Sequence, residues 1–182
     1  MSRFYRYDQP LMALCACLWC QAICPVPGTV NFTNNPSIGT AGVRESMSDG
    51  YIKSWGRRFR RGDVVVPCRP ISALIRLAGI STIDFFSLDV EGAELVVLQT
   101  FDWTVPVKVF CIELDDNSVS ESDRARVTKV RTLLFERGYL ETDAFKMGSN
   151  KVFIHGSLNS TLSSRMRYCR HMMAWGHPSG QC

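Results

Sequence analysis

The sequence lacks three features that would narrow its class at once: a large excess of one charge, an apolar run as long as a membrane span, and an internal repeat. A formal net charge of +4 is too small to predict a nucleic-acid partner. The most apolar stretch, Leu11 to Cys24, is shorter than the roughly 20 residues of a transmembrane helix. Without a repeat, solenoids and propellers are excluded, and the ordinary composition fits one domain with one core.

The stretch from Leu11 to Cys24 has two interpretations, which the sequence leaves open. Its length and lack of charge are typical of a signal-peptide core or a membrane anchor. Equally, it fits a helix or strand of the sheet. The cellular location, cytoplasmic or secretory, stays open with it, and the sequons at Asn31 and Asn159 favour secretion only under the first interpretation.

Eight cysteines are many, yet their spacing predicts neither a disulfide scaffold nor a zinc site. Cys17 and Cys20 have the spacing of a metal or redox pair, but no matching second pair or histidines accompany them. Cys68 and Cys111 fall in predicted core segments, and Cys111, within a buried strand, is interpreted as a small hydrophobic residue. The redox compartment therefore stays open.

The residues from Ile83 to Glu94, IDFFSLDVEGAE, change abruptly from apolar to acidic. The apolar part predicts a strand that is buried on both faces of a parallel sheet. Asp89 and Glu91 follow in a turn, and Glu94 opens a predicted helix. Because ligands of open α/β sheets bind at the carboxyl ends of strands, these acids are candidate site residues. The alternative is that they only cap the helix.

A second apolar segment, VKVFCIE, ends in a further acidic group of Glu113, Asp115 and Asp116. If the two strands are adjacent and parallel, both acidic ends face one crevice. Such carboxylates can accept a hydroxyl proton or bind a divalent cation, although no metal site is predicted.

The remaining elements are predicted from local patterns. We expect a strand near Gly28 to Thr33, another from Asp63 to Pro67, a short helix over 71–78, an amphipathic cover helix over 122–137, and a hairpin of 139–145 with 151–155. Five cations with two aromatic residues crowd residues 53–61 and form either a solvated loop or a docking site for an acidic partner.

These segments, in this order, resemble the later part of the FkbM-type methyltransferase domain, a class I family that uses S-adenosylmethionine and is associated with O-methylation. The resemblance rests on ISALIRLAGI, IDFFSLDVEGAELVVLQ and VKVFCIELDD. It implies a Rossmann-like sheet, mostly parallel with a C-terminal antiparallel strand, and a small-molecule or sugar acceptor. It further implies catalytic roles for Asp89 and Glu91 and a substrate pocket at Glu94, Asp115 and Asp116.

The family's glycine-rich cofactor loop is not recognisable in the sequence. Gly39 and Gly42 follow a polar segment instead of a strand, so cofactor-binding residues cannot be assigned. We therefore expect an N-terminally incomplete domain over 28–156, preceded by the apolar segment 1–27 and followed by a tail over 157–182. If residues 11–24 form an anchor, they contact a membrane. The rival function is a non-catalytic domain that binds an acidic partner through residues 53–61.

Overall fold

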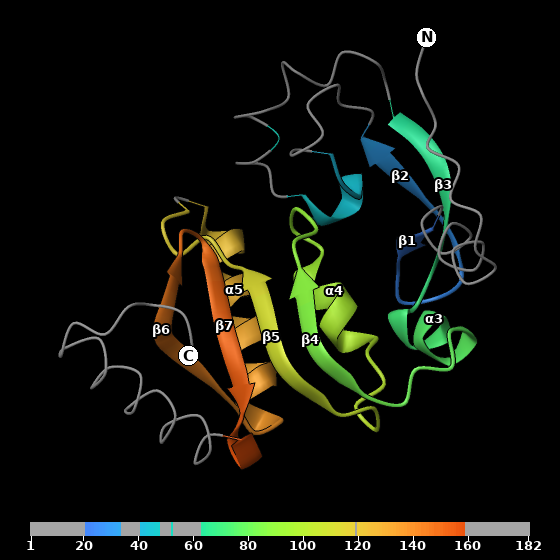
Figure 1. The fold of residues 1–182 in the computed structure, drawn as a ribbon. Helices are drawn as coiled ribbons and strands as arrows, with labels where there is room; N and C mark the ends of the chain where they lie inside the picture. Colours follow the sequence, from blue (N-terminus) through green and yellow to red (C-terminus); the bar gives the residue numbers. More distant parts are fainter. Residues whose placement is uncertain (1–20, 34–40, 48–51, 53–62, 119, 159–182) are drawn as a thin grey trace, which may run out of the picture.

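The computed structural model describes residues 21–33, 41–47, 52, 63–118 and 120–158, and it has a mixed α/β fold with two sheets. Figure 1 shows the smaller sheet on the side of the larger sheet where β4 is the edge strand. The elements are β1 (Ala22–Ile23), β2 (Gly28–Thr33), the 3-10 helix η2 (Arg44–Ser46), β3 (Asp63–Arg69), α3 (Ile71–Leu77), β4 (Ile83–Leu88), α4 (Glu94–Gln99), β5 (Val107–Glu113), α5 (Glu121–Glu136), β6 (Tyr139–Met147) and β7 (Asn150–His155).

The smaller sheet has the order β1-β3-β2, with β1 parallel and β2 antiparallel to β3. Cys68 of β3 pairs with Ala22 on one side and Gly28 on the other, which brings it close to Cys24. The two cysteines form a disulfide, and both are buried. The cysteine spacing predicted no disulfide scaffold and gave no sign of this bond, because strand pairing brings together two cysteines that are 44 residues apart in sequence.

The larger sheet has the order β4-β5-β7-β6. Only β4 and β5 are parallel; β7 is antiparallel to both β5 and β6. The α/β class is confirmed, but the described sheets are mixed, so the predicted mostly parallel sheet was wrong. The cause is the hairpin of β6 and β7, whose second strand, β7, lies between β5 and β6.

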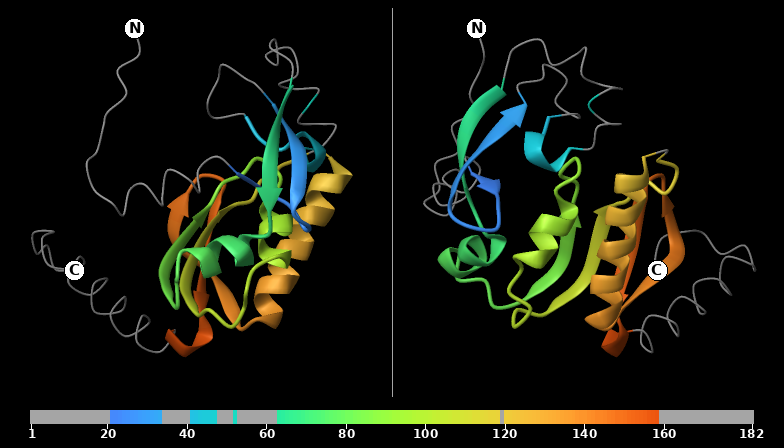
Figure 2. Two further views of the ribbon diagram at one scale, coloured as in Figure 1. Left: turned by 90° about the vertical axis from the view of Figure 1, so that its right-hand side faces the viewer. Right: turned by 180° about the vertical axis from the view of Figure 1, so that it is seen from behind.

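The core lies between the larger sheet and helices α4 and α5, which cover one of its faces (Figures 1 and 2). Phe110 and Ile112 of the central strand β5 are fully buried, and Phe86 packs edge-on against Phe110 with ring centroids 5.5 Å apart. The side chain of Phe85, by contrast, points away from the core and is 60% exposed. The prediction that this strand is buried on both faces was wrong, because none of the described helices covers the second face.

Helix α5 lies against the sheet through one apolar stripe. Val127, Val130 and Leu134 recur at helical spacing and are at most 5% exposed. The Ser120 side chain accepts a hydrogen bond from the Asp123 backbone N–H at the start of the helix, and Gly138, with φ 84°, follows its end. The stripe belongs to the same buried cluster as Phe110 and Ile112 of β5.

Several expectations concern residues outside the described ranges. These are the metal or redox pair at Cys17 and Cys20, most of the stretch from Leu11 to Cys24, the basic cluster 53–61 and the tail from residue 159 onward. Within the described ranges, no helix combines the length and apolar character that crossing a membrane requires.

Candidate active site

The acidic turn after β4 is built from unusual backbone conformations. Asp89 follows the last residue of the strand, and the turn then passes through Glu91 with φ 51° and Gly92 with φ 105°. A non-glycine residue with positive φ is uncommon and costs on the order of 1–3 kcal/mol, so the surrounding structure has to enforce it. Gly42 and η2 pack against this turn, since a Cβ atom on Gly42 would lie 3.1 Å from the Glu91 Cβ.

We expect Gly92→Ala to lower the free energy of unfolding by about 2–3 kcal/mol, because the new Cβ atom adds a clash to an unfavourable φ. That Cβ atom would lie 2.6 Å from the Ser46 carbonyl oxygen. Gly148→Ala is the matched control: Gly148 also has positive φ, 65°, but a Cβ atom added there would meet nothing within 4 Å. Urea unfolding checks this, and equal losses in both variants would contradict the role of the contact with η2.

Glu94 is buried although its side chain ends in a carboxyl group. The residue is 3% exposed, and its Oε1 accepts a hydrogen bond from the Gly92 N–H at 3.0 Å. Its Oε2 lies 3.6 Å from Arg126 Nε, and Arg126 Nη1 lies 2.8 Å from Asp123 Oδ1. A buried charge of this kind is tolerated when it is paired and hydrogen-bonded. Glu94 therefore ties the turn to α5.

Glu113, the last residue of β5, faces the acidic turn. Carboxylate oxygens of Asp89, Glu91 and Glu113 all lie within 4.8 Å of one another. Burial raises the pKa of Glu113 to about 7, and a hydrogen bond with the Asp89 side chain and the nearby negative charges act in the same direction. Near neutral pH, Glu113 is thus present in both protonated and charged forms, as a general acid or base requires.

We expect Glu113 to make the stability of the protein depend on pH. Its pKa is about 7 in the folded state against 4.5 as the unperturbed value, so the folded state binds the proton more tightly. Its contribution is fully present below pH 4.5 and is lost as the pH rises through 7. Because the side chain is only partly buried, we expect a loss on the order of 1–2 kcal/mol. Urea unfolding between pH 5 and 8 measures it, and an identical pH slope in Glu113→Gln would contradict the assignment.

A cavity of about 200 Å³ opens beside these carboxylates, between the ends of β4 and β5 and the first turns of α5. Its wall is strongly acidic, and Arg126 is the one cation that lines it among the described residues. The lining residues with carboxylates are Glu91, Glu94, Glu113, Asp115 and Asp123. Such a wall suits a neutral hydroxyl compound or a cation and disfavours an anion.

A second cavity, of about 240 Å³, is lined by Asp89, which does not line the first one. Its wall combines apolar side chains such as Ile23 and Val97 with the Asp89 carboxylate and the Gln21 amide. The Gln21 Oε1 atom is buried and has no hydrogen-bond partner among the described residues. A buried acceptor without a partner is costly, so this atom is a candidate ligand contact.

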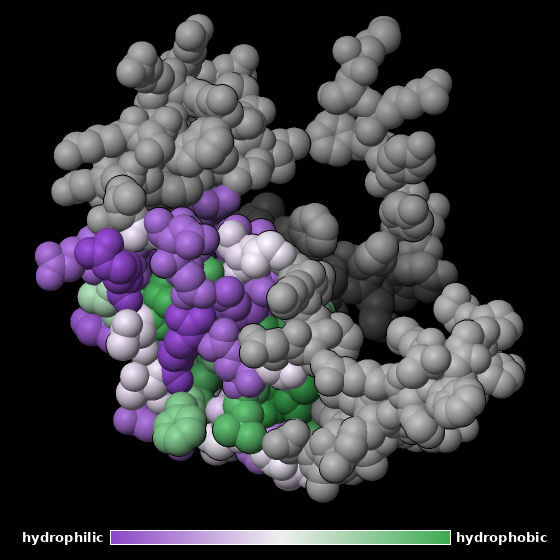
Figure 3. All heavy atoms as spheres, turned by 90° about the vertical axis from the view of Figure 1, so that its left-hand side faces the viewer, coloured by the Kyte–Doolittle hydropathy of each residue, from purple (hydrophilic) through white to green (hydrophobic). Residues whose placement is uncertain are grey.

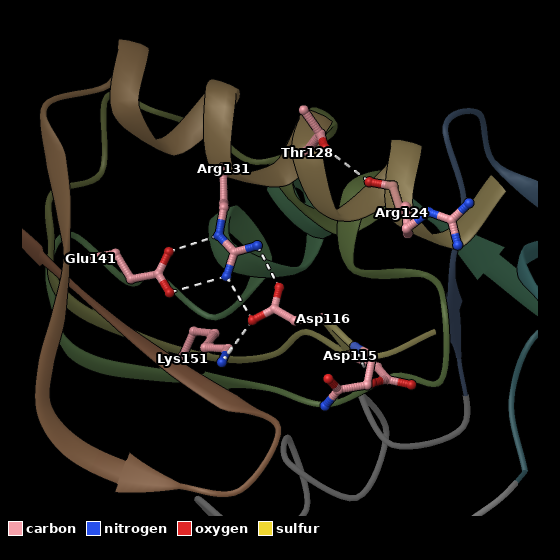
Figure 4. Close-up of polar contacts among 8 residues, drawn as sticks. Asp115, Asp116, Arg124, Thr128, Arg131, Glu141 and Lys151 are labelled. Carbon is pink, nitrogen blue, oxygen red and sulfur yellow. Dashed lines mark hydrogen bonds and ion pairs between the residues drawn. The ribbon is translucent and has the colours of Figure 1, made fainter. Parts of the chain in front are cut away.

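The two remaining pocket candidates, Asp115 and Asp116, separate in the structure. Asp115 is exposed and lines the acidic cavity. Asp116 does not line it, because its oxygens lie 2.6 Å from Arg131 Nη1 and 2.8 Å from Lys151 Nζ, with Glu141 on the far side of Arg131 (Figure 4). Arg131 and Lys151 lower the pKa of Asp116 to about 2. The substrate-pocket role of Asp116 stays a prediction.

Sequence reasoning did not single out three residues of this region. Glu113 was placed at the acidic end of a strand, but its proximity to Asp89 depends on the register that pairs Leu88 with Ile112. Arg126 lies on the predicted amphipathic helix, outside its apolar stripe, and its spacing of three residues from Asp123 was the available signal of a pair. Gln21 stood in a stretch interpreted as uniformly apolar, so its polar side chain was the available signal.

Acidic side chains converge at the carboxyl ends of the parallel strands β4 and β5. In α/β proteins, ligands bind at this edge of the sheet. The family model of the methyltransferase FkbM domain matches residues 19–141. The chain therefore belongs to the FkbM methyltransferase domain family, as its resemblance predicted. No curated protein and no solved structure matches the chain significantly.

Proposed function

We propose that the chain transfers a methyl group from S-adenosylmethionine to a hydroxyl group of a small molecule or sugar. The observation that carries this proposal is the pair of Glu113 and Asp89, hydrogen-bonded at the strand ends, with the pKa of Glu113 raised to about 7. A hydroxyl group must lose its proton when it is methylated, and a carboxylate poised near neutral pH is suited to accept it.

In this proposal the residues around the crevice have different roles in the reaction. Glu113 in its charged form accepts the hydroxyl proton, and the protonated Glu113 then donates a hydrogen bond to Asp89, which together with the Asp89 charge helps to keep the pKa of Glu113 high. Glu91 and Glu94 shape the turn, since Glu94 accepts the Gly92 N–H at 3.0 Å. Asp115 lines the rim of the cavity, where it can accept further hydroxyl hydrogens of a sugar. Methyl transfer depends mainly on alignment, so a rigid turn is of direct use.

The cavity that Asp89 lines fits the cofactor in charge and hydrogen bonding. S-adenosylmethionine, when bound, supplies a methyl group on a positively charged sulfur. Asp89 would complement the positive charge, and Gln21 Oε1, which has no hydrogen-bond partner among the described residues, would accept a hydrogen bond from an amino group. The apolar walls, which include Ile23 and Val97, would contact a flat ring.

The proposal is tested by transfer from S-adenosylmethionine that carries an isotope label in its methyl group. The purified chain is incubated with separate pools of hydroxyl-bearing small molecules, sugars, amines and thiols. We expect label in an ether product from the hydroxyl or sugar pools. Label in the amine or thiol products alone would overturn O-methylation while leaving methyl transfer standing, and no label in any pool would count against both.

A further inference from the structure

A larger cavity, of about 460 Å³, lies at the opposite end of the sheet from the acidic turn. Its wall includes residues where β5 and β6 begin and where β7 ends: Val107, Tyr139 and His155. Figure 3 looks onto the edge of the sheet with β6, where hydrophobic side chains gather toward this lower end beneath a hydrophilic band. The proposed methyl-transfer residues do not line this cavity, so methyl transfer does not explain it.

The charges around this cavity are opposite in sign to those at the acidic turn. Lys108 and Arg137 line it, and no carboxylate does among the residues that the structure describes. Lys108 Nζ lies 2.5 Å from Asp84 Oδ1, but that pair is largely exposed and weak. Arg137 is exposed, and none of the ion pairs among the described residues includes it. The cavity therefore presents to an anion a guanidinium group that no described carboxylate neutralises.

An aromatic wall stands next to this guanidinium group. The Arg137 Cζ atom lies 5.0 Å from the ring centroid of Trp103. Trp103 in turn packs against Phe101, with ring centroids 5.1 Å apart, and against Tyr139 at 6.3 Å. Trp103 and Tyr139 therefore give the cavity an aromatic wall, with the Arg137 guanidinium group over the indole ring, and this wall offers contact area to a flat ring.

The polar groups at the back of the cavity are also held in place. The Tyr139 hydroxyl donates to the Val107 carbonyl oxygen at 2.7 Å, and the His155 ring stands edge-on to Tyr139 with centroids 5.1 Å apart. His155 Nδ1 and Ser157 Oγ form a hydrogen bond of 2.7 Å. Tyr139 and His155 therefore have little rotamer freedom to lose when a ligand binds, so this part of the wall is preorganised.

We propose that this cavity binds a small planar anion, whose ring lies against Trp103 and whose acidic group is held by Arg137 and Lys108. The ligand class is an aromatic ring with a carboxylate or a phosphate, because both acids match the guanidinium fork. Stacking supplies contact area, and the cation selects the charge. This site is independent of the methyl-transfer proposal and stands or falls separately from it.

The test uses 2-naphthoate as the probe and its neutral amide, 2-naphthamide, as the matched compound, each titrated calorimetrically into the purified chain. We expect saturable 1:1 binding of 2-naphthoate and at least about tenfold weaker binding of the amide. Arg137→Met keeps the aliphatic stem and removes the charge, so it should weaken naphthoate binding about tenfold or more. Arg124→Met, on the neighbouring helix α5 but outside the cavity, should leave the affinity unchanged.

Trp103→Leu provides the second arm, with circular dichroism to show that the variant is folded. It should weaken both compounds, whereas Arg137→Met should weaken only the acid. The proposal is overturned if the folded wild-type chain shows no saturable naphthoate binding. It is also overturned if Arg137→Met binds naphthoate as tightly as Arg124→Met does, or if the amide binds as tightly as the acid.

Discussion

Replacing Cys24 and Cys68 together by serine is expected to lower the free energy of unfolding by about 4 kcal/mol under non-reducing conditions. The cross-link joins residues 44 positions apart, and the chain-entropy model assigns about 4 kcal/mol to a closed loop of that length. The bond fastens β1 and the start of β2 to β3, so its loss loosens the strand that carries Ala22 and the neighbouring Gln21 next to the Asp89 cavity.

The single cysteine variants and a variant of the unpaired Cys111 provide the comparisons for this prediction. Each single variant, Cys24→Ser or Cys68→Ser, should lose nearly as much as the double variant, because either one breaks the same bond. Cys111→Ala is the matched control, since Cys111 is a buried cysteine without a disulfide and should cost only about 1 kcal/mol. Urea unfolding measures all four. A double variant that unfolds at the wild-type midpoint would show that the bond contributes nothing.

Replacing Glu113 by glutamine is expected to lower the rate of methyl transfer by about 100- to 10,000-fold, the usual contribution of a positioned general base. Glutamine keeps the size and hydrogen-bonding capacity of the side chain but cannot accept the proton. The wild-type rate should rise with pH and level off above about 7, since the charged form of Glu113 is the active one. In Glu113→Gln this step should disappear.

Asp89→Asn separates the two members of the pair. Its hydrogen bond and charge both raise the pKa of Glu113, although burial is the larger cause, so the step in the pH–rate profile should move only part of the way toward acidic pH. Glu136→Gln, an exposed carboxylate at the end of α5, is the control and should keep the wild-type profile. A step near pH 7 that persists in Glu113→Gln would exclude Glu113 as the base.

Local patterns in the sequence predicted most elements and could not predict how they combine. The strand at Ile83, the helix that opens at Glu94 and the cover helix ending before Gly138 follow from apolar spacing and turn residues, which are local. Burial of a strand's second face is not local. Phe85 looks like a core residue by composition, and only the arrangement of the helices leaves it exposed.

The candidate site likewise combines residues that one segment of sequence identifies with residues that only strand pairing brings together. Asp89, Glu91 and Glu94 could be singled out because they stand at the switch from strand to helix, which one segment of sequence contains. The raised pKa of Glu113 needs burial and the carboxylates of a neighbouring strand, so it depends on the pairing of β4 with β5. Asp116 looked equivalent to Asp115 in sequence, yet Arg131 and Lys151, from distant segments, bind its carboxylate.

The most direct test of the proposed methyl transfer is calorimetric titration of S-adenosylmethionine into the purified chain, with an Asp89→Ala variant beside it. We expect saturable 1:1 binding that Asp89→Ala weakens at least about tenfold, because Asp89 lines the cavity that complements the cofactor's positive charge. Circular dichroism shows whether each protein is folded. A folded wild-type chain that does not bind the cofactor, or a folded Asp89→Ala variant that binds it as tightly, would contradict the proposed cofactor site.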